Sequence, residues 1–382
     1  MRILFTFVGG SGHYEPLAPL ARAARLAGHN VQFACRPSMI PIVEADHFSA
    51  VAAGPDVEDL VAVAVAPLAE PDAATEDRVL RDGFARRTAT RRAADLIALG
   101  QDLRPDLLVS DEVDYGAIIA AEHLGLPHAT VLVLVAGSFG RADLLSEPLN
   151  EVRSHFGLTS DPHLLMLERH LVLAPFPVSF RDPAYPLPKT ACAFRPAVLE
   201  RREVRAHTDL WVGPGPRIYV TLGTIFNMES GDLFHRILGG LAELPVEVIA
   251  TVGRQRDPAE FGAKPSNVRI ERFIPQADVL PGCDLVVCHG GSGSVIGALS
   301  HGVPLLLFPM GADQPHNAAR CLALGVGRVL DPVRAGPVAI RDATAAMLAD
   351  LKCCERAQEI RRETLALPDV STVIAKLEAL VR

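Results

Sequence analysis

The sequence lacks any hydrophobic run long enough to cross a membrane. Its longest apolar stretches, such as residues 61–69 and 129–136, are far shorter than the ~20 residues that a membrane-spanning helix requires. The N-terminal segment 2–8 is typical of a β-strand, and it has none of the charged start, long apolar core and cleavage site of a signal peptide. We therefore expect a cytoplasmic protein without a membrane span.

Basic blocks and paired metal-ligand motifs are also missing. Lys and Arg number 37 against 45 Asp and Glu, a net charge of −8, which makes nucleic acid an unexpected partner. The seven cysteines form no C-x-x-C pair, the histidines have no metal-ligand spacing, and no D-x-D motif occurs. A disulfide framework, a zinc ribbon and a bound metal are therefore not expected. The few lysines and many alanines are typical of GC-rich bacterial genomes such as those of actinobacteria.

What the sequence does contain is one local pattern that occurs twice. The apolar segment 3–8 is followed by a glycine-rich turn and a helical segment, 16–27. The apolar segment 217–222 is followed by Gly223 and a helical segment around 232–244. Strand, glycine turn and helix in this order are typical of parallel sheets. The sequence therefore predicts an α/β protein with two Rossmann-like, doubly wound parallel-sheet domains.

A proline-rich stretch, 174–216, separates the two halves, and its segment 211–216 is the best linker candidate. We expect one domain over 1–210, a second over 211–365, and a C-terminal helix over 366–382 that packs back on the first domain. Ligands of doubly wound sheets bind beyond the carboxyl ends of the strands. The expected site is thus a central cleft that both domains face.

A glycine-rich motif, His289-Gly-Gly-Ser-Gly-Ser294, follows a predicted strand in the second half and opens a helix. The N-terminus of a helix offers free N–H groups and a partial positive charge, and glycines allow phosphate oxygens to approach the backbone. The motif therefore favours a diphosphate site. A strand-to-helix turn with a capping serine is the plainer alternative. Spaced glycines followed by Asp313 also resemble a weak dinucleotide fingerprint, which would indicate hydride chemistry.

The first half holds a candidate general base, His13, just after its first predicted strand. Histidine titrates near neutrality, as a general base must, although a polar residue at a helix start is the alternative. Asp111 ends another strand of the same sheet and would orient the imidazole. Glu112 is adjacent and stays open as an alternative partner, whereas Asp106 begins the strand and lies at the wrong end.

Several motifs together resemble those of the GT-B glycosyltransferases, most closely the bacterial enzymes that glycosylate macrolides, enediynes and other secondary metabolites. These are Gly12-His13-x-x-Pro16, Thr221-Leu-Gly-Thr224, Phe273-Ile-Pro-Gln276, His289-Gly-Gly-Ser-Gly-Ser294 and Gly311-Ala-Asp-Gln314. The resemblance covers most of the chain. It implies inverting, metal-independent transfer of a sugar from a nucleotide donor to a hydroxyl-type acceptor, with no further cofactor.

The resemblance also assigns roles to individual residues. His13 would be the general base and Asp111 its partner. The diphosphate would be held by Thr224, His289, Gly291, Ser292, Gly293 and Ser294. Phe273 and Ile274 would flank the nucleobase, and Asp313 and Gln314 would contact sugar hydroxyls.

One departure from the family pattern bears on the donor. Relatives that use UDP-sugars usually have a Glu eight residues after the motif histidine, where it binds ribose hydroxyls, but this chain has Gly297 there. This favours a dTDP-sugar, whose deoxyribose lacks the 2′-hydroxyl. The expected acceptor is an apolar natural product, and the expected state is a monomer or homodimer. A UDP-sugar transferase acting on a lipid or small molecule, a sugar-nucleotide epimerase of the same fold and a non-catalytic auxiliary protein are the alternatives.

Overall fold

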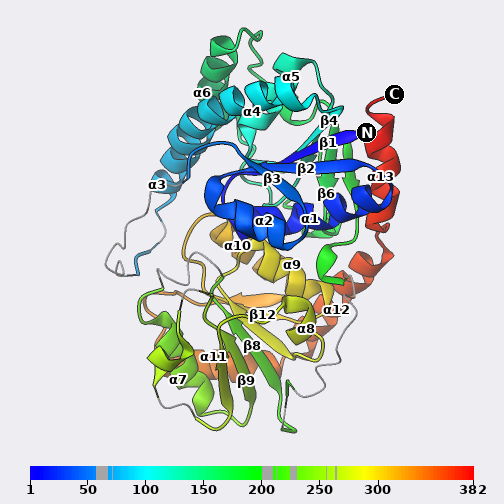
Figure 1. Cartoon of the computed structure of the whole chain (residues 1–382). Coiled ribbons are helices and arrows are strands. Elements are labelled where there is room, and N and C mark those ends of the chain that lie inside the picture. Colours follow the sequence, from blue (N-terminus) through cyan, green and yellow to red (C-terminus); the bar gives the residue numbers. More distant parts are fainter. Residues whose placement is uncertain are drawn as a thin grey trace. The chain divides into compact units, whose positions relative to one another are not determined.

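A computed structural model describes residues 1–382 except 57–67, 71, 200–209, 212, 224–229, 255 and 263–264. The chain forms two compact units (Figure 1). The first unit combines Met1–Val61, Ala73–Arg195 and Leu367–Arg382, and the second combines Ala62–Asp72 with Pro196–Ala366. Each unit is built around its own sheet.

The first unit has a seven-stranded sheet in the order β3-β2-β1-β4-β5-β6-β7, and every pair of neighbouring strands is parallel. Its strands are β1 (Arg2–Thr6), β2 (Asn30–Cys35), β3 (Ser49–Ala52), β4 (Leu107–Asp111), β5 (His128–Val131), β6 (Leu171–Ala174) and β7 (Ala191–Ala193). Its α-helices are α1 (Ser11–Leu26), α2 (Ile40–Ala45), α3 (Ala73–Arg78), α4 (Ala89–Leu103), α5 (Tyr115–Leu124), α6 (Ala142–His155) and α13 (Val370–Ala379), and a π-helix, η2 (Val79–Thr88), joins α3 to α4.

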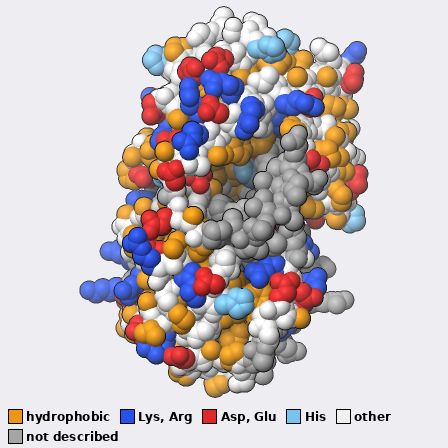
Figure 2. Space-filling view, turned by 90° about the vertical axis from the view of Figure 1, so that its left-hand side faces the viewer, with side chains coloured by type: hydrophobic (Ala, Val, Ile, Leu, Met, Phe, Trp, Pro, Cys, Tyr) orange, Lys and Arg blue, Asp and Glu red, His pale blue; other side chains and the backbone are white. Residues whose placement is uncertain are grey.

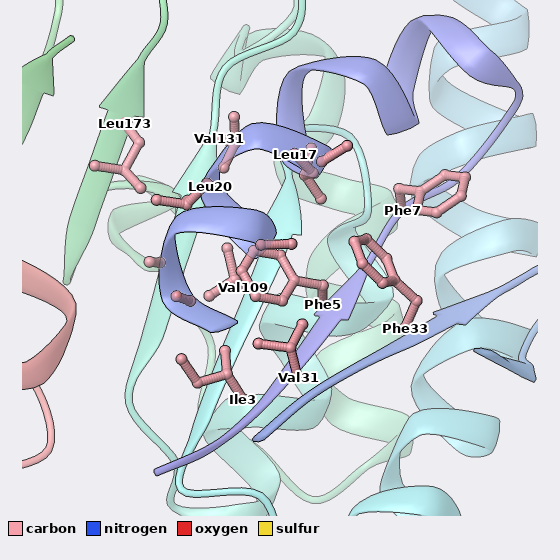
Figure 3. Packing of buried hydrophobic residues seen from close by; sticks show 14 of the residues in the cluster. Ile3, Phe5, Phe7, Leu17, Leu20, Val31, Phe33, Val109, Val131 and Leu173 are labelled. Carbon is pink, nitrogen blue, oxygen red and sulfur yellow. The ribbon is translucent and has the colours of Figure 1, made fainter. Parts of the chain in front are cut away.

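One hydrophobic core cluster of the first unit lies between the sheet and α1 (Figure 3). The central strand β1 buries side chains on both of its faces, as expected of a strand in a parallel sheet that helices cover. Phe5 and Phe33 lie side by side from adjacent strands, with ring centroids 5.3 Å apart. Leu17 and Leu20 of α1 are fully buried in the same cluster. This packing fixes α1 over the sheet.

The second unit has a six-stranded parallel sheet in the order β10-β9-β8-β11-β12-β13. Its strands are β8 (Arg217–Thr221), β9 (Glu247–Thr251), β10 (Val268–Glu271), β11 (Leu285–Cys288), β12 (Leu305–Leu307) and β13 (Gly327–Val329). Its α-helices are α7 (Leu233–Ala242), α8 (Gln276–Val279), α9 (Ser292–Ser300), α10 (Gln314–Leu324), α11 (Pro337–Leu348) and α12 (Leu351–Ala366). The predicted fold class, two doubly wound parallel-sheet domains, is confirmed.

The units divide at Arg195 and Pro196, upstream of the expected boundary at 210. Part of the N-terminal half also belongs to the second unit. Leu68 packs against the hydrophobic cluster of that unit, and Glu70 forms an ion pair with Arg334 at 2.6 Å. The chain returns to the first unit at Leu367, after which α13 packs against α1.

The strand order changes direction once in each sheet, between β1 and β4 and between β8 and β11. These are the switch points of the two sheets, and doubly wound sheets in general bind their ligands beyond the carboxyl ends of the strands at such points. None of the helices formed by the described residues combines the length and the apolar character that a bilayer span requires. On the face seen in Figure 2, basic and acidic side chains are interspersed, without an extended area of one sign.

Candidate active site

The structure brings His13 and Asp111 together at the switch point of the first sheet. Nδ1 of His13 lies 3.2 Å from Oδ2 of Asp111, although 98 residues separate them. Helix α1 begins at Ser11, earlier than the expected start at Pro16, so His13 lies in its first turn. Asp111 ends β4, the strand next to β1. The carboxylate is fully buried, whereas the imidazole is 22% exposed. The buried Asp111 carboxylate therefore fixes Nδ1 of the His13 ring.

The Asp111 carboxylate has a fixed orientation because three backbone N–H groups donate to it. Oδ2 accepts from the N–H of Val8 at 2.8 Å, and Oδ1 accepts from Val113 at 2.8 Å and from Asp114 at 2.9 Å. These bonds fix the direction of both carboxylate oxygens. Gly9 makes the close approach of His13 possible, because a Cβ there would lie 2.9 Å from the imidazole and its φ is +88°.

The alternative partner, Glu112, turns to another strand end. Its Oε1 accepts from the backbone N–H groups of Val133 and Leu134 at 2.6 and 2.5 Å, just after β5. Asp106 bonds Arg2 at the opposite end of the strands. Of the three carboxylates considered from sequence, only Asp111 therefore lies against the imidazole in this structure.

A buried ion pair beneath the dyad escaped the sequence analysis. Asp114 caps α5 and accepts from Thr6 at 2.6 Å and from Arg92 at 2.5 Å. Arg92 also donates to the carbonyl of Ala53, and both charged side chains are almost completely buried. The sequence feature that could have indicated this ion pair is Asp114, a third acidic residue just after the apolar strand that ends at Asp111. This network joins β1, α4 and the start of α5.

His289 lies at the switch point of the second sheet, directly after β11. It is only 8% exposed, and its Nδ1 has no hydrogen-bond partner among the described residues. A Cβ at Gly223 or Gly291 would lie 2.6 or 2.5 Å from Nε2, so glycines are required on both sides of the ring. Burial lowers the pKa of His289 to about 4, and the imidazole is therefore neutral near pH 7. A neutral ring can donate one hydrogen bond but does not act as a cation.

The start of α9 carries a polar network that joins two predicted parts of the site. Oδ2 of Asp313 accepts from the N–H of Ser292 at 3.1 Å and from its hydroxyl at 2.6 Å. Asn317, which the sequence analysis missed, donates to the same oxygen at 2.8 Å and to the carbonyl of Gly290 at 2.9 Å. Its position four residues after Asp313 on a helix was the available signal. The glycine-rich turn and the Asp313 loop thus form one structure.

The remaining residues predicted to bind the sugar donor differ in their exposure to solvent. Gln314 is 1% exposed, and its amide oxygen accepts from the N–H of Met310 at 2.7 Å. Gly293 and Ser294 lie in the first turn of α9, and a Cβ at Gly293 would meet nothing within 4 Å. Thr224 lies outside the described residues.

The residues predicted to flank the nucleobase follow β10. Phe273 is 43% exposed, and the guanidinium of Arg254 lies over its ring, 3.8 Å from the centroid. Ile274 is 9% exposed. Phe273 lines a surface hollow of about 500 Å³ together with Arg254, Pro258, Glu271 and Arg272. The Arg254 guanidinium thus covers one face of the Phe273 ring beside this hollow.

Gly297, where UDP-using relatives usually have a Glu, faces helix α8. A Cβ at this position would lie 2.5 Å from Oε1 of Gln276. The same side chain donates to the hydroxyl of Ser294 at 3.4 Å. Gln276 therefore occupies the space next to Gly297.

Comparison with known proteins agrees with this architecture. Residues 235–380 match the erythromycin biosynthesis protein CIII-like C-terminal domain. The chain is 30% identical to the L-demethylnoviosyl transferase of Streptomyces niveus over 86% of this chain and 84% of that protein. It is 28% identical to the tylactone mycaminosyltransferase of Streptomyces fradiae over 100% of this chain and 92% of that protein.

Solved structures show the same similarity. The spinosyn forosaminyltransferase SpnP superposes with a TM-score of 0.78 at 26% identity, covering 100% of this chain and 99% of that one. The glycosyltransferase VinC, solved in complex with dTDP, gives a TM-score of 0.78 at 25% identity, with coverage of 100% and 99%.

Two parallel-sheet units with polar sites at their switch points, together with these matches, define a glycosyltransferase of the GT-B fold. The chain belongs to the family of bacterial glycosyltransferases of antibiotic and other secondary-metabolite biosynthesis. The predictions of the family, the fold and an enzyme that transfers sugars from nucleotide donors are confirmed.

Proposed function

We propose that the protein transfers a sugar from a dTDP-sugar to a hydroxyl group of an apolar natural product, with inversion at the anomeric carbon and without a metal ion. The observation that carries this proposal is the contact between His13 and Asp111, because direct displacement requires a deprotonated acceptor.

His13 is the general base in this reaction. Its Nδ1 faces Asp111, so Nε2 is the nitrogen directed away from the carboxylate and toward an acceptor. The acceptor O–H proton moves to Nε2 while the oxygen attacks the anomeric carbon. The bond from that carbon to the diphosphate breaks, and its electron pair goes to the leaving oxygen. Asp111 stabilises the imidazolium that forms.

The leaving diphosphate binds at the start of α9. The backbone N–H groups of Gly293 and Ser294 and the positive end of the helix dipole offset its charge, and His289 donates a hydrogen bond. Ser292 can donate its hydroxyl to the diphosphate when that hydroxyl leaves Asp313, to which it donates in the structure. Thr224 adds a hydroxyl to the same group. Asp313 and Gln314 contact sugar hydroxyls. The D-x-D motif that commonly accompanies metal-dependent transfer is missing from the sequence.

A dTDP-sugar is supported by three facts. Gly297 offers no carboxylate to a ribose 2′-hydroxyl, and Gln276 occupies the adjoining space. VinC, a structural neighbour, binds dTDP. A relative from Streptomyces peucetius, 29% identical, is a TDP-daunosamine transferase. Phe273 and Ile274 flank the base.

An apolar acceptor is supported by a hydrophobic cluster in the first unit. Its buried members include Leu80 of η2, Ile118 of α5 and Leu149 of α6. Partly exposed apolar side chains pack against it, among them Phe84, Phe139, Leu144 and Phe156. Such side chains suit a largely apolar ligand.

The test is to compare His13→Ala with His163→Ala, a control at an exposed histidine. His13→Ala should abolish sugar transfer while the binding of dTDP, measured by calorimetry, stays unchanged. His163→Ala should change neither. Loss of dTDP binding together with transfer in His13→Ala would contradict the role of His13 as base, and tighter binding of UDP than dTDP by the wild type would contradict the donor assignment.

A further inference from the structure

Glu112 is a carboxylate that the proposed reaction does not use. It is half-buried, and it holds one oxygen, Oε1, against two backbone N–H groups after β5. No donor among the described residues forms a hydrogen bond to its other oxygen, Oε2. The side chain is thus fixed in place with one acceptor atom unused.

The charge of Glu112 is not matched by an ion pair within the described part of the chain. The nearby Arg181 guanidinium is directed to main-chain carbonyls instead, those of Tyr185 at 2.8 Å and Leu134 at 3.3 Å. Burial raises the pKa of Glu112 to about 7, with Asp111 adding to the rise and Arg181 opposing it. An oxygen of a half-buried carboxylate that accepts no hydrogen bond from the described residues can accept one from a ligand.

The position of Glu112 is next to the His13–Asp111 dyad. His13 follows β1, Glu112 follows β4, and the N–H groups that anchor it follow β5. These three strands are neighbours in the middle of the sheet, and their carboxyl ends lie side by side. Strands in a sheet lie ~4.8 Å apart, so the carboxyl group of Glu112 is within roughly 10 Å of the dyad. Its neighbours Val113 and Leu134 belong to the apolar cluster described above.

We propose that Glu112 binds the sugar acceptor, with Oε2 accepting a hydrogen bond from a second donor group, a hydroxyl or an ammonium, of the molecule whose hydroxyl reaches His13. This inference rests on the proposed function and adds a polar requirement to an otherwise apolar acceptor. The substrate class is a polyhydroxylated or amine-bearing apolar compound.

Glu112→Gln separates recognition from a structural role. The amide oxygen of Gln can still accept from the N–H groups of Val133 and Leu134, but the outer atom becomes an NH₂ donor. The fold should therefore be retained, with a melting temperature within about 2 °C of the wild type. Glu168→Gln, the same change at an exposed position, is the matched control.

The probes are 1-naphthol, 1,5-dihydroxynaphthalene and 5-(aminomethyl)-1-naphthol, which differ only in a second donor. Binding is measured by equilibrium dialysis in the presence of dTDP, so the comparison does not depend on turnover. The wild type should bind at least one of the two-donor probes about tenfold more tightly than 1-naphthol, as a hydrogen bond to a charged group predicts. Glu112→Gln should reduce this ratio to about one without weakening 1-naphthol binding, and Glu168→Gln should keep the ratio.

The pH dependence gives a second readout. The charged groups around Glu112 are Asp111 and Arg181, and Tyr115 of α5 stays neutral because burial raises its pKa. The preference of the wild type for a two-donor probe should fall as the pH drops through about 7, where Glu112 becomes protonated, and Glu112→Gln should show no such change.

Three results would overturn the proposal. The wild type could bind all probes with equal dissociation constants, Glu112→Gln could still prefer the two-donor probes, or Glu112→Gln could bind all probes more weakly by the same factor. A preference for the hydroxyl probe alone or the ammonium probe alone identifies the donor group. Failure of the proposed function would be seen separately, because the wild type would then not bind dTDP or not transfer a sugar.

Discussion

The hydroxyl of Ser292 donates to the carboxylate of Asp313 at 2.6 Å, which joins a residue expected to hold the diphosphate to one expected to hold the sugar. The same carboxylate oxygen accepts the N–H of Ser292 and therefore occupies part of the helix start. A negative charge at that point opposes the binding of a diphosphate but suits sugar hydroxyls.

This geometry predicts opposite effects on nucleotide and sugar in Asp313→Asn. The affinity for dTDP should stay the same or rise, because a charge that repels the diphosphate is removed. Sugar transfer should fall by about tenfold to a hundredfold, as expected when a hydrogen bond to a charged group is lost. Calorimetry with dTDP and steady-state kinetics measure the two effects, and a parallel loss in both would contradict the separate roles.

Asp111→Asn should lower kcat by about 10³-fold or more, because the amide cannot stabilise the imidazolium and favours the wrong tautomer of His13. Binding of dTDP should not change, since Asp111 lies in the other unit. The matched control is Asp106→Asn, which removes a carboxylate from the opposite end of the same strand. A kcat within threefold of wild type in Asp111→Asn would argue against the dyad.

Removal of Arg92 should destabilise the protein strongly. Arg92→Met leaves Asp114 buried without its cation, and breaking a buried pair in this way costs about 3–5 kcal/mol. Urea unfolding followed by circular dichroism measures the change. Arg81→Met, which removes a surface ion pair with Glu147, should cost no more than about 1 kcal/mol. A similar decrease in the free energy of unfolding in both variants would show that the buried pair stabilises the protein no more than the surface pair does.

The two buried histidines should lower stability as the solution is acidified below about pH 6.5, against an opposite contribution from Glu112, whose pKa burial raises. Burial lowers the pKa of His128 to about 3 and that of His289 to about 4, so both rings are neutral in the folded protein. Between these values and 6.5 the unfolded chain binds more protons than the folded one, and protonation therefore favours unfolding. Melting temperatures measured from pH 7.5 to 4.5 should decrease less in His128→Gln than in wild type. An identical slope would exclude His128 as a contributor.

Donor preference should respond to position 297. Gly297→Glu supplies a carboxylate for a ribose 2′-hydroxyl, but it must displace the side chain of Gln276. We expect the ratio of UDP to dTDP affinity to rise, together with a lower melting temperature. Adding Gln276→Ala should relieve the crowding and restore stability while keeping the new preference. No change in the ratio for the double variant would mean that other contacts select the nucleotide.

The sequence was sufficient for the parts of the molecule that depend on local pattern. Apolar segments ending in glycine turns predicted the two sheets, and the placement of His13 and Asp111 after neighbouring strands predicted their contact. Parallel strands align their carboxyl ends at one edge, so strand order alone brings such residues together.

Contacts that depend on side-chain direction were beyond the sequence. Glu112 and Asp111 are adjacent, and only the course of the loop after β4 sends one to Val133 and the other to His13. Asn317 bonds Asp313 because α10 begins where it does. Leu68 packs against the core of the second unit, and no local sequence pattern predicts this contact.

The return of the chain to the first unit has a consequence for synthesis. Val373, Ile374 and Leu377 of α13 complete a core whose other members include β1 and α1, from the opposite end of the sequence. The ribosome makes α13 after the strands of both sheets, so the first unit is completed only after the second unit has been made. Until α13 has been made, a face of α1 stays uncovered, and the nascent chain exposes an apolar surface that can bind chaperones or associate with other chains.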